Sequence, residues 1–263
     1  MTVLAQFHWN ADPVAVDLGF IALRWYGLLF GAGFLASFWL VRWAYRREGR
    51  NAEDVETLLL WTIVCTIVGA RLVHCLAYEP QRYLADPVSI LKVWEGGLAS
   101  HGGMLGIVTA LWLHSRRRPD QPFLWLLDRV AVAAALAGGF VRCGNFVNSE
   151  IVGEPSDLPW AVVFERVDPL PRHPAQLYEA AAYFVLFGAL LAIYRRRGAR
   201  TPRGLLVGLF LVLAFGVRIA VETVKVRQEE FGADLPFTMG QVLSVAPVLI
   251  GVWLLFRAQR APT

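Results

Sequence analysis

The chain has 263 residues, of which 56% are hydrophobic and only 17% are charged, and its mean hydropathy is +0.48. Soluble domains are typically about one-quarter charged, so this composition excludes an ordinary soluble protein and is typical of a polytopic membrane protein. The net charge of +4 does not indicate nucleic-acid binding, because more than half of the 25 Lys and Arg residues form four short clusters, each after an apolar run. The clusters are Arg42, Arg46, Arg47 and Arg50; Arg116, Arg117 and Arg118; Arg195, Arg196, Arg197, Arg200 and Arg203; and Arg257 and Arg260.

Seven apolar runs of roughly the ~20 residues that a helix needs to cross a bilayer follow one another along the chain. They cover residues 20–41, 55–77, 97–113, 123–141, 175–194, 204–224 and 240–256. The basic clusters follow the first, third, fifth and seventh runs, which predicts an outward N-terminus and a cytoplasmic C-terminus. We therefore expect an all-α polytopic membrane protein, with seven transmembrane helices in one integral membrane domain over residues 1–263. The segments 75–96, 144–174 and 225–239 are expected outside.

The outward segment 144–174, between the fourth and fifth runs, is rich in Pro, Asp and Glu. It is expected to be a small extracytoplasmic cap, because Trp160, Val162, Val163 and Phe164 can supply an apolar centre.

Ionisable groups inside apolar runs cost at least about 2.5–3.5 kcal/mol at mid-bilayer and indicate function by default. Arg71 and His74 share a turn of the second run, and His101 opens the third. Gly102 and Gly106 form a GxxxG pair that favours close helix packing. Packing does not explain His101, which needs a polar partner or a functional role.

The densest polar stretch follows the fourth run and reads RCGNFVNSEIVG over residues 142–153. If the helix continues at about 100° per residue, its polar side chains share one face. These side chains belong to Arg142, Asn145, Ser149 and Glu150, and Gly153 falls on the same face. Arg218 and Glu222 in the sixth run are also four residues apart. They form either an internal ion pair or, with Arg142, an anion site.

No Walker loop, GxSxG or HExxH sequence is present. Cys65, Cys75 and Cys143 lack metal-binding spacing, so neither a metal nor another cofactor is expected. The polar groups instead suit an anionic lipid headgroup, because Arg binds phosphate bidentately. A lipid or ion transporter and a phospholipid hydrolase remain alternatives to a transferase.

The sequence resembles the bacterial prolipoprotein diacylglyceryl transferase family over nearly its full length. The matching motifs are LRWYG (23–27), VGAR (68–71), WEGGLASHGG (94–103), RCGNFVNSE (142–150), RHPAQLYE (172–179) and RIAVE (218–222). The chain departs from the family pattern at Ser149, where the family has Gly, and over residues 224–227, where an aromatic-Arg run is usual.

The resemblance implies a multi-pass enzyme of the bacterial cytoplasmic (inner) membrane that acts in lipoprotein biosynthesis. Such an enzyme transfers the sn-1,2-diacylglyceryl group of phosphatidylglycerol to the thiol of the lipobox cysteine of a prolipoprotein signal peptide, releasing glycerol-1-phosphate. Family roles carry over as catalytic onto Tyr26, His101, Arg142 and Arg218, and as phosphatidylglycerol-binding onto Arg142, Asn145, Glu150, Gly153, Arg218 and Glu222. Either His101 takes the thiol proton, or the field of the two arginines activates the thiol.

Overall fold

The computed structural model describes residues 7–227 and 237–260, so most of the expected outward segment 225–239 lies outside the described residues. The chain divides into two compact units. Unit 1 comprises Met1–Leu40 and Asp128–Thr263, and unit 2 comprises Val41–Leu127.

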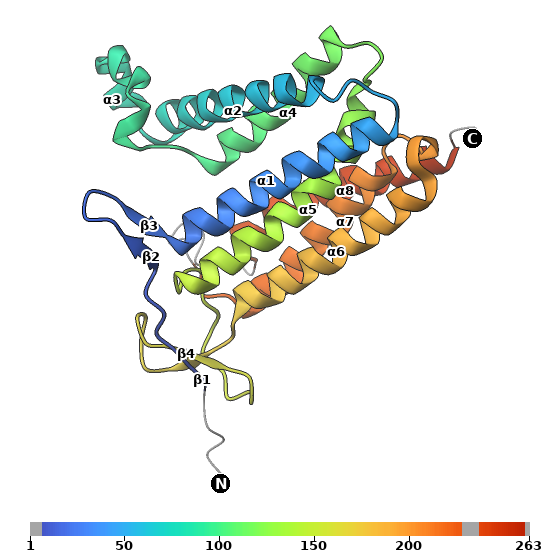
Figure 1. Cartoon of the computed structure of the whole chain (residues 1–263). Helices are drawn as coiled ribbons and strands as arrows, with labels where there is room; N and C mark the ends of the chain where they lie inside the picture. The colour runs from blue at the N-terminus through green and yellow to red at the C-terminus, as the bar shows by residue number, and fades with distance from the viewer. Residues whose placement is uncertain (1–6, 228–236, 261–263) are drawn as a thin grey trace. The chain divides into compact units, whose positions relative to one another are not determined.

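Five long helices contribute to unit 1 and lie along one another in Figure 1. They are α1 (Trp25–Arg47), α5 (Phe123–Val147), α6 (Ala175–Arg197), α7 (Leu205–Val221) and α8 (Met239–Arg260), of which α1 and α5 continue into unit 2. The 3-10 turns η4 (Gly198–Arg200) and η5 (Glu222–Val224) extend α6 and α7. Small residues bring the helices together: Gly33 of α1 lies against Phe140, and Gly139 of α5 lies against Phe184.

Asp128, near the start of α5, stabilises the beginning of α7. Its carboxylate accepts the Gly204 N–H at 2.8 Å and the Val207 N–H at 3.0 Å, whereas its oxygen lies 3.9 Å from Arg129 Nη1. It therefore caps the N-terminus of α7, which has free N–H groups and a positive dipole end.

The strands of unit 1 gather at one end of these helices (Figure 1). Strands β1 (Phe7–Trp9), β4 (Val162–Phe164) and β5 (Pro171–Arg172) form one sheet in the order β1-β4-β5, and β2 (Val14–Asp17) pairs antiparallel with β3 (Ala22–Arg24). The first expected span therefore began too early, because residues 20–24 belong to the β2–β3 hairpin.

A small apolar core lies under the β1-β4-β5 sheet. Phe146, Val162 and Phe164 are buried there, with Trp9 and Val152 packed against them. Val163 is buried as expected, but Trp160 is 55% exposed, so the prediction that it belongs to the apolar centre was wrong. Its indole N–H donates to the Tyr178 hydroxyl instead.

Unit 2 is built around α2 (Asp54–Val73) and α4 (Ser100–Arg117). Between them lie the π-helix η1 (His74–Tyr78), helix α3 (Pro80–Ala85) and the turns η2 (Pro87–Leu91) and η3 (Val93–Glu95). A β-carbon on Gly102 would fall 2.2 Å from the carbonyl oxygen of Gly69, and one on Gly106 would fall 2.1 Å from that of Cys65. The expected close helix packing is therefore confirmed.

Six helices among the described residues are long and apolar enough to cross a membrane, which is the mark of a multi-pass membrane protein. They begin at Trp25, Asp54, Phe123, Ala175, Leu205 and Met239. Helix α4 is not among them, since polar residues occupy both of its ends. The seventh span thus stays a prediction.

Candidate active site

The polar residues of unit 1 collect where its helices meet the strands. Helices α5 and α7 end there, whereas α1, α6 and α8 begin there (Figure 1). Five segments distant in sequence therefore bring their terminal residues to the same end of unit 1.

The signature segment is a helix end followed by a tight loop, not a continuous helix. Helix α5 stops at Val147, and Ser149 and Ile151 both have φ of +57°. The helical-face prediction was therefore wrong beyond Val147, because left-handed residues turn the chain back on itself. The Glu150 N–H donates to the Asn145 carbonyl at 2.9 Å, so the loop still returns Glu150 to Asn145.

Glu150 is held by amide groups on both sides of this loop. Its carboxylate accepts hydrogen bonds from Asn145 Nδ2 and Asn148 Nδ2, each at 3.1 Å. Its carbonyl accepts one from Gln176 Nε2 on α6 at 2.5 Å. Asn145 Oδ1 in turn accepts from Arg142 Nη1 at 3.1 Å. The structure thus brings together three of the residues predicted to form the site.

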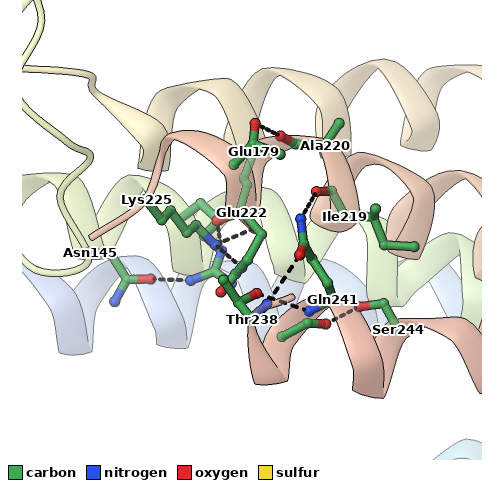
Figure 2. Close-up of polar contacts among 12 residues, drawn as sticks. Asn145, Glu179, Ile219, Ala220, Glu222, Lys225, Thr238, Gln241 and Ser244 are labelled. Carbon is green, nitrogen blue, oxygen red and sulfur yellow. Dashed lines mark hydrogen bonds and ion pairs between the residues drawn. The ribbon is translucent and has the colours of Figure 1, made fainter. Parts of the chain in front are cut away.

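Arg142 continues this network into a cluster of opposite charges. Its members Glu179, Glu222 and Lys225 are labelled in Figure 2. The Nε of Arg142 lies 2.9 Å from Glu179 Oε2. The two groups form an ion pair, but their relative orientation does not allow a hydrogen bond. The Lys225 ammonium donates to Glu179 Oε1 at 2.9 Å and lies 3.5 Å from Glu222 Oε2. Buried charges persist in a protein only when they are paired in this way.

Arg218 lies near this cluster, but its guanidinium has no hydrogen bond or ion pair among the described residues. Arg218 lies in the last turn of α7, and its carbonyl accepts a hydrogen bond from the N–H of Glu222, a member of the cluster. The Nε of Arg218 is buried without a hydrogen-bond partner. The Arg218 guanidinium therefore has no protein partner among the described residues and can bind an anion.

An ion pair between Arg218 and Glu222, one of the two alternatives that their spacing left open, is absent among the described residues. The backbone does not prevent such a contact, because the Glu222 N–H still donates to the Arg218 carbonyl as in a continuous helix. The Glu222 carboxylate instead lies 3.5 Å from the Lys225 ammonium, at the end of the 3-10 turn η5.

Tyr26 and Gly153 occupy the edges of the cluster. The Tyr26 ring packs on Gly144, where an added β-carbon would fall 2.9 Å from Tyr26 Cδ2. Gly153 is enclosed by two backbone segments, since an added β-carbon would fall 2.7 Å from the carbonyl oxygens of both His173 and Val224. Gly153 is thus required by close backbone approach.

The structure places His101 in unit 2, in the first turn of α4, with its side chain exposed. Arg71 is also in unit 2 and is fully used as a structural group. Its guanidinium donates to the backbone carbonyls of Ile90 at 2.9 Å and Ser89 at 2.7 Å, and further to those of Lys92, Gly96 and Gly97. The functional reading of Arg71 is replaced by a role in holding the segment before α4.

An ion pair outside the apolar helices ties the loop 165–172 to the site. Arg172 donates through Nε to both Asp168 carboxylate oxygens at 3.1 Å and through Nη1 to the Gly153 carbonyl at 3.1 Å. The hydrogen bonds and charge of Arg172 hold the pKa of Asp168 below its usual value. Asp168 in turn raises the pKa of Arg172.

The sequence analysis missed the role of Lys225. The signal was a basic residue three positions after Glu222, in a segment expected outside, where basic residues are scarce. Lys225 pairs with two carboxylates because it is buried. Hydropathy does not predict that a residue at the end of a 3-10 turn is buried. The place of Glu179 between two cations, Arg142 and Lys225, was not predicted either.

Residues 13–257 match the family model described as prolipoprotein diacylglyceryl transferase. The chain belongs to the prolipoprotein diacylglyceryl transferase family. Relatives named phosphatidylglycerol–prolipoprotein diacylglyceryl transferase include a Tolumonas auensis protein that is 51% identical, the match covering 94% of this chain and 95% of the relative. A Chloroherpeton thalassium protein of the same name is 46% identical, over 98% of this chain and 96% of the relative. Membership of this family of transferases confirms the resemblance that the motifs carried.

Proposed function

We propose that this protein transfers the sn-1,2-diacylglyceryl group of phosphatidylglycerol to the thiol of the lipobox cysteine in a prolipoprotein signal peptide, releasing glycerol-1-phosphate. The observation that carries the proposal is the pair of guanidinium groups, Arg142 near the end of α5 and Arg218 in the last turn of α7, at the same end of a set of apolar helices. Such a pair can hold the phosphate of an anionic lipid while the acyl chains stay in the bilayer.

In the proposed reaction the sulfur attacks carbon 3 of the diacylglyceryl group. A C–S bond forms, the C–O bond to phosphate breaks, and the oxygen leaves with glycerol phosphate. The leaving group gains one negative charge, which Arg142 and Arg218 stabilise electrostatically. No covalent enzyme intermediate is needed, since the substrate supplies its own nucleophile.

The remaining predicted residues bind and orient the lipid headgroup. Asn145, Glu150 and Glu222 offer amide and carboxylate groups to glycerol hydroxyls, and Tyr26 closes the edge of the site. Gly153 keeps the loop after Glu150 close to the segment that carries Lys225. We assign the thiol proton to His101, with direct activation by the arginine field as the alternative, because a free thiol titrates near about 8.5.

We further propose seven spans in the bacterial inner membrane, with α4 as the added span, the N-terminus and the cap 144–174 outside, and the C-terminus in the cytoplasm. The alternating Arg clusters support this arrangement. Reporter fusions after Arg50, Arg118 and Arg203 should report cytoplasm, and fusions near Ala85 and Asp157 should report the outside. A further outward position, Ala233, lies outside the described residues. Two swapped assignments would contradict the topology.

A transfer assay tests the reaction. Purified protein is incubated with phosphatidylglycerol and a lipobox peptide, or with the same peptide carrying Ser in place of Cys. We expect a thioether-linked diacylglyceryl peptide and stoichiometric glycerol phosphate only with the cysteine peptide. Glycerol phosphate released without peptide would indicate a hydrolase, and lipid movement without release would indicate a transporter.

A further inference from the structure

The proposed reaction assigns no role to Lys225, which is one of the few buried charged residues of unit 1. Its residue is only 7% exposed, and its ammonium contacts the carboxylates of Glu179 and Glu222. A lysine is rarely buried without a specific partner, because desolvating its charge is costly. The two carboxylate partners of Lys225 therefore indicate that this residue has a specific role at the site.

The backbone fixes Lys225 independently of these ion pairs. It forms a β-bridge with Gly153, and the neighbouring Val224 carbonyl accepts the Glu154 N–H at 2.8 Å. The backbone that carries the ammonium is thus held by a short strand-like pairing with the loop that follows Glu150. The position of the charge does not depend on a flexible surface side chain.

The carboxylate that matters most is that of Glu222, which follows Arg218 by one turn. The Glu222 backbone N–H donates to the Arg218 carbonyl, so the two residues are local neighbours. Opposite charges at this spacing attract each other whenever their side chains are free. In the structure, however, Glu222 faces Lys225, and Arg218 has no ionic partner among the described residues.

We propose that Lys225 is a positioning residue that holds the carboxylate of Glu222 away from Arg218, so that the Arg218 guanidinium stays open for the lipid phosphate. The inference rests on the proposed function, since it names the phosphate of phosphatidylglycerol as the anion. Without the ammonium, Glu222 becomes an internal anion that competes with the substrate for Arg218. The consequence is weaker binding of anionic lipid, which a purely structural ion pair does not predict.

The test is a double-mutant cycle on the full chain. The variants are Lys225→Met, Glu222→Gln, the double variant and Lys225→Arg, with Arg166→Met, an exposed cap arginine, as the charge-matched control. The apparent KM for phosphatidylglycerol is measured per folded molecule. Binding of phosphatidylglycerol, against neutral phosphatidylcholine, is measured separately.

We expect Lys225→Met to raise the KM by about 10-fold or more, the scale of losing one charge contact at a binding site. In the Glu222→Gln background, the same substitution should raise it less than about threefold, because the competing carboxylate has been removed. Lys225→Arg and Arg166→Met should stay near the wild type.

An unchanged KM in Lys225→Met, or the same loss in both backgrounds, would overturn the inference. If the wild type binds phosphatidylglycerol but makes no thioether product, the proposed function fails. The lipid-binding cycle then still decides the role of Lys225.

Discussion

The ring of Tyr26 lies against the backbone of Gly144, which joins the first residues of α1 to the last turn of α5. A β-carbon on Gly144 would fall 2.9 Å from Tyr26 Cδ2, closer than side chains normally approach. The contact fixes the phenol ring beside Gly144, which lies between Arg142 and Asn145 in the sequence. The position of the ring therefore depends on the absence of a side chain at residue 144.

Gly144→Ala should displace the Tyr26 ring and lower diacylglyceryl transfer by roughly 10-fold, since small displacements at an active site are costly. Gly188→Ala in α6 is the matched control, because an added β-carbon there has no atom within 4 Å. We expect the control to keep full activity. Equal activity in the two variants would show that the tight Tyr26–Gly144 contact is dispensable.

Ser149→Gly should stabilise the protein by roughly 1 kcal/mol, because Ser149 adopts a left-handed φ of +57° that glycine accepts without strain. The substitution also removes a buried hydroxyl oxygen without a hydrogen-bond partner. Thermal unfolding in detergent measures the change. A lower midpoint would mean that the serine side chain contributes more than the backbone strain costs.

Asp168→Asn should lower stability at neutral pH by about 1 kcal/mol or less, the usual range for a partly exposed ion pair. Because the folded-state pKa of Asp168 is lowered, its contribution is complete above the unfolded value of about 4 and is lost as pH falls through the folded value. The difference from wild type should therefore be constant from about pH 5 to 8 and shrink below about pH 4. Asp157→Asn, at an exposed cap position, serves as control. A difference that grows toward acid would contradict this account.

Cys143→Ala should retain most transfer activity, although Cys143 adjoins Arg142 in sequence. The acceptor thiol belongs to the prolipoprotein, so no enzyme thioether is required. Activity per folded molecule is the measurement. Its loss in a well-folded variant would support a covalent route through Cys143.

The sequence predicted the helices well because the apolar runs are long and their flanks are basic. It located Arg142, Asn145 and Glu150 in one place, but for a partly wrong reason. A helical face was expected, whereas a left-handed turn at Ser149 and Ile151 returns Glu150 to Asn145. Turn geometry of this kind is hard to predict at residues other than glycine.

The ion-pair partners of the charged site residues were harder to predict from the sequence than the helices that carry these residues. The four-residue spacing of Arg218 and Glu222 left open a direct ion pair or an anion site with Arg142, and the Glu222 carboxylate faces Lys225 instead of Arg218. That choice depends on a β-bridge between residues 153 and 225, a contact between distant segments. Local patterns carry no information about such a contact.

The central claim is that Arg142 and Arg218 hold the lipid phosphate, and substitution by Lys tests it most directly. Lys keeps the charge but cannot form the bidentate hydrogen bonds of a guanidinium. We predict that Arg142→Lys and Arg218→Lys each lower kcat/KM per folded molecule by about 100-fold or more, while membrane insertion and unfolding midpoint stay near those of an Arg166→Lys control. Normal turnover in both variants, or a loss of folded protein with normal specific activity, would contradict the claim.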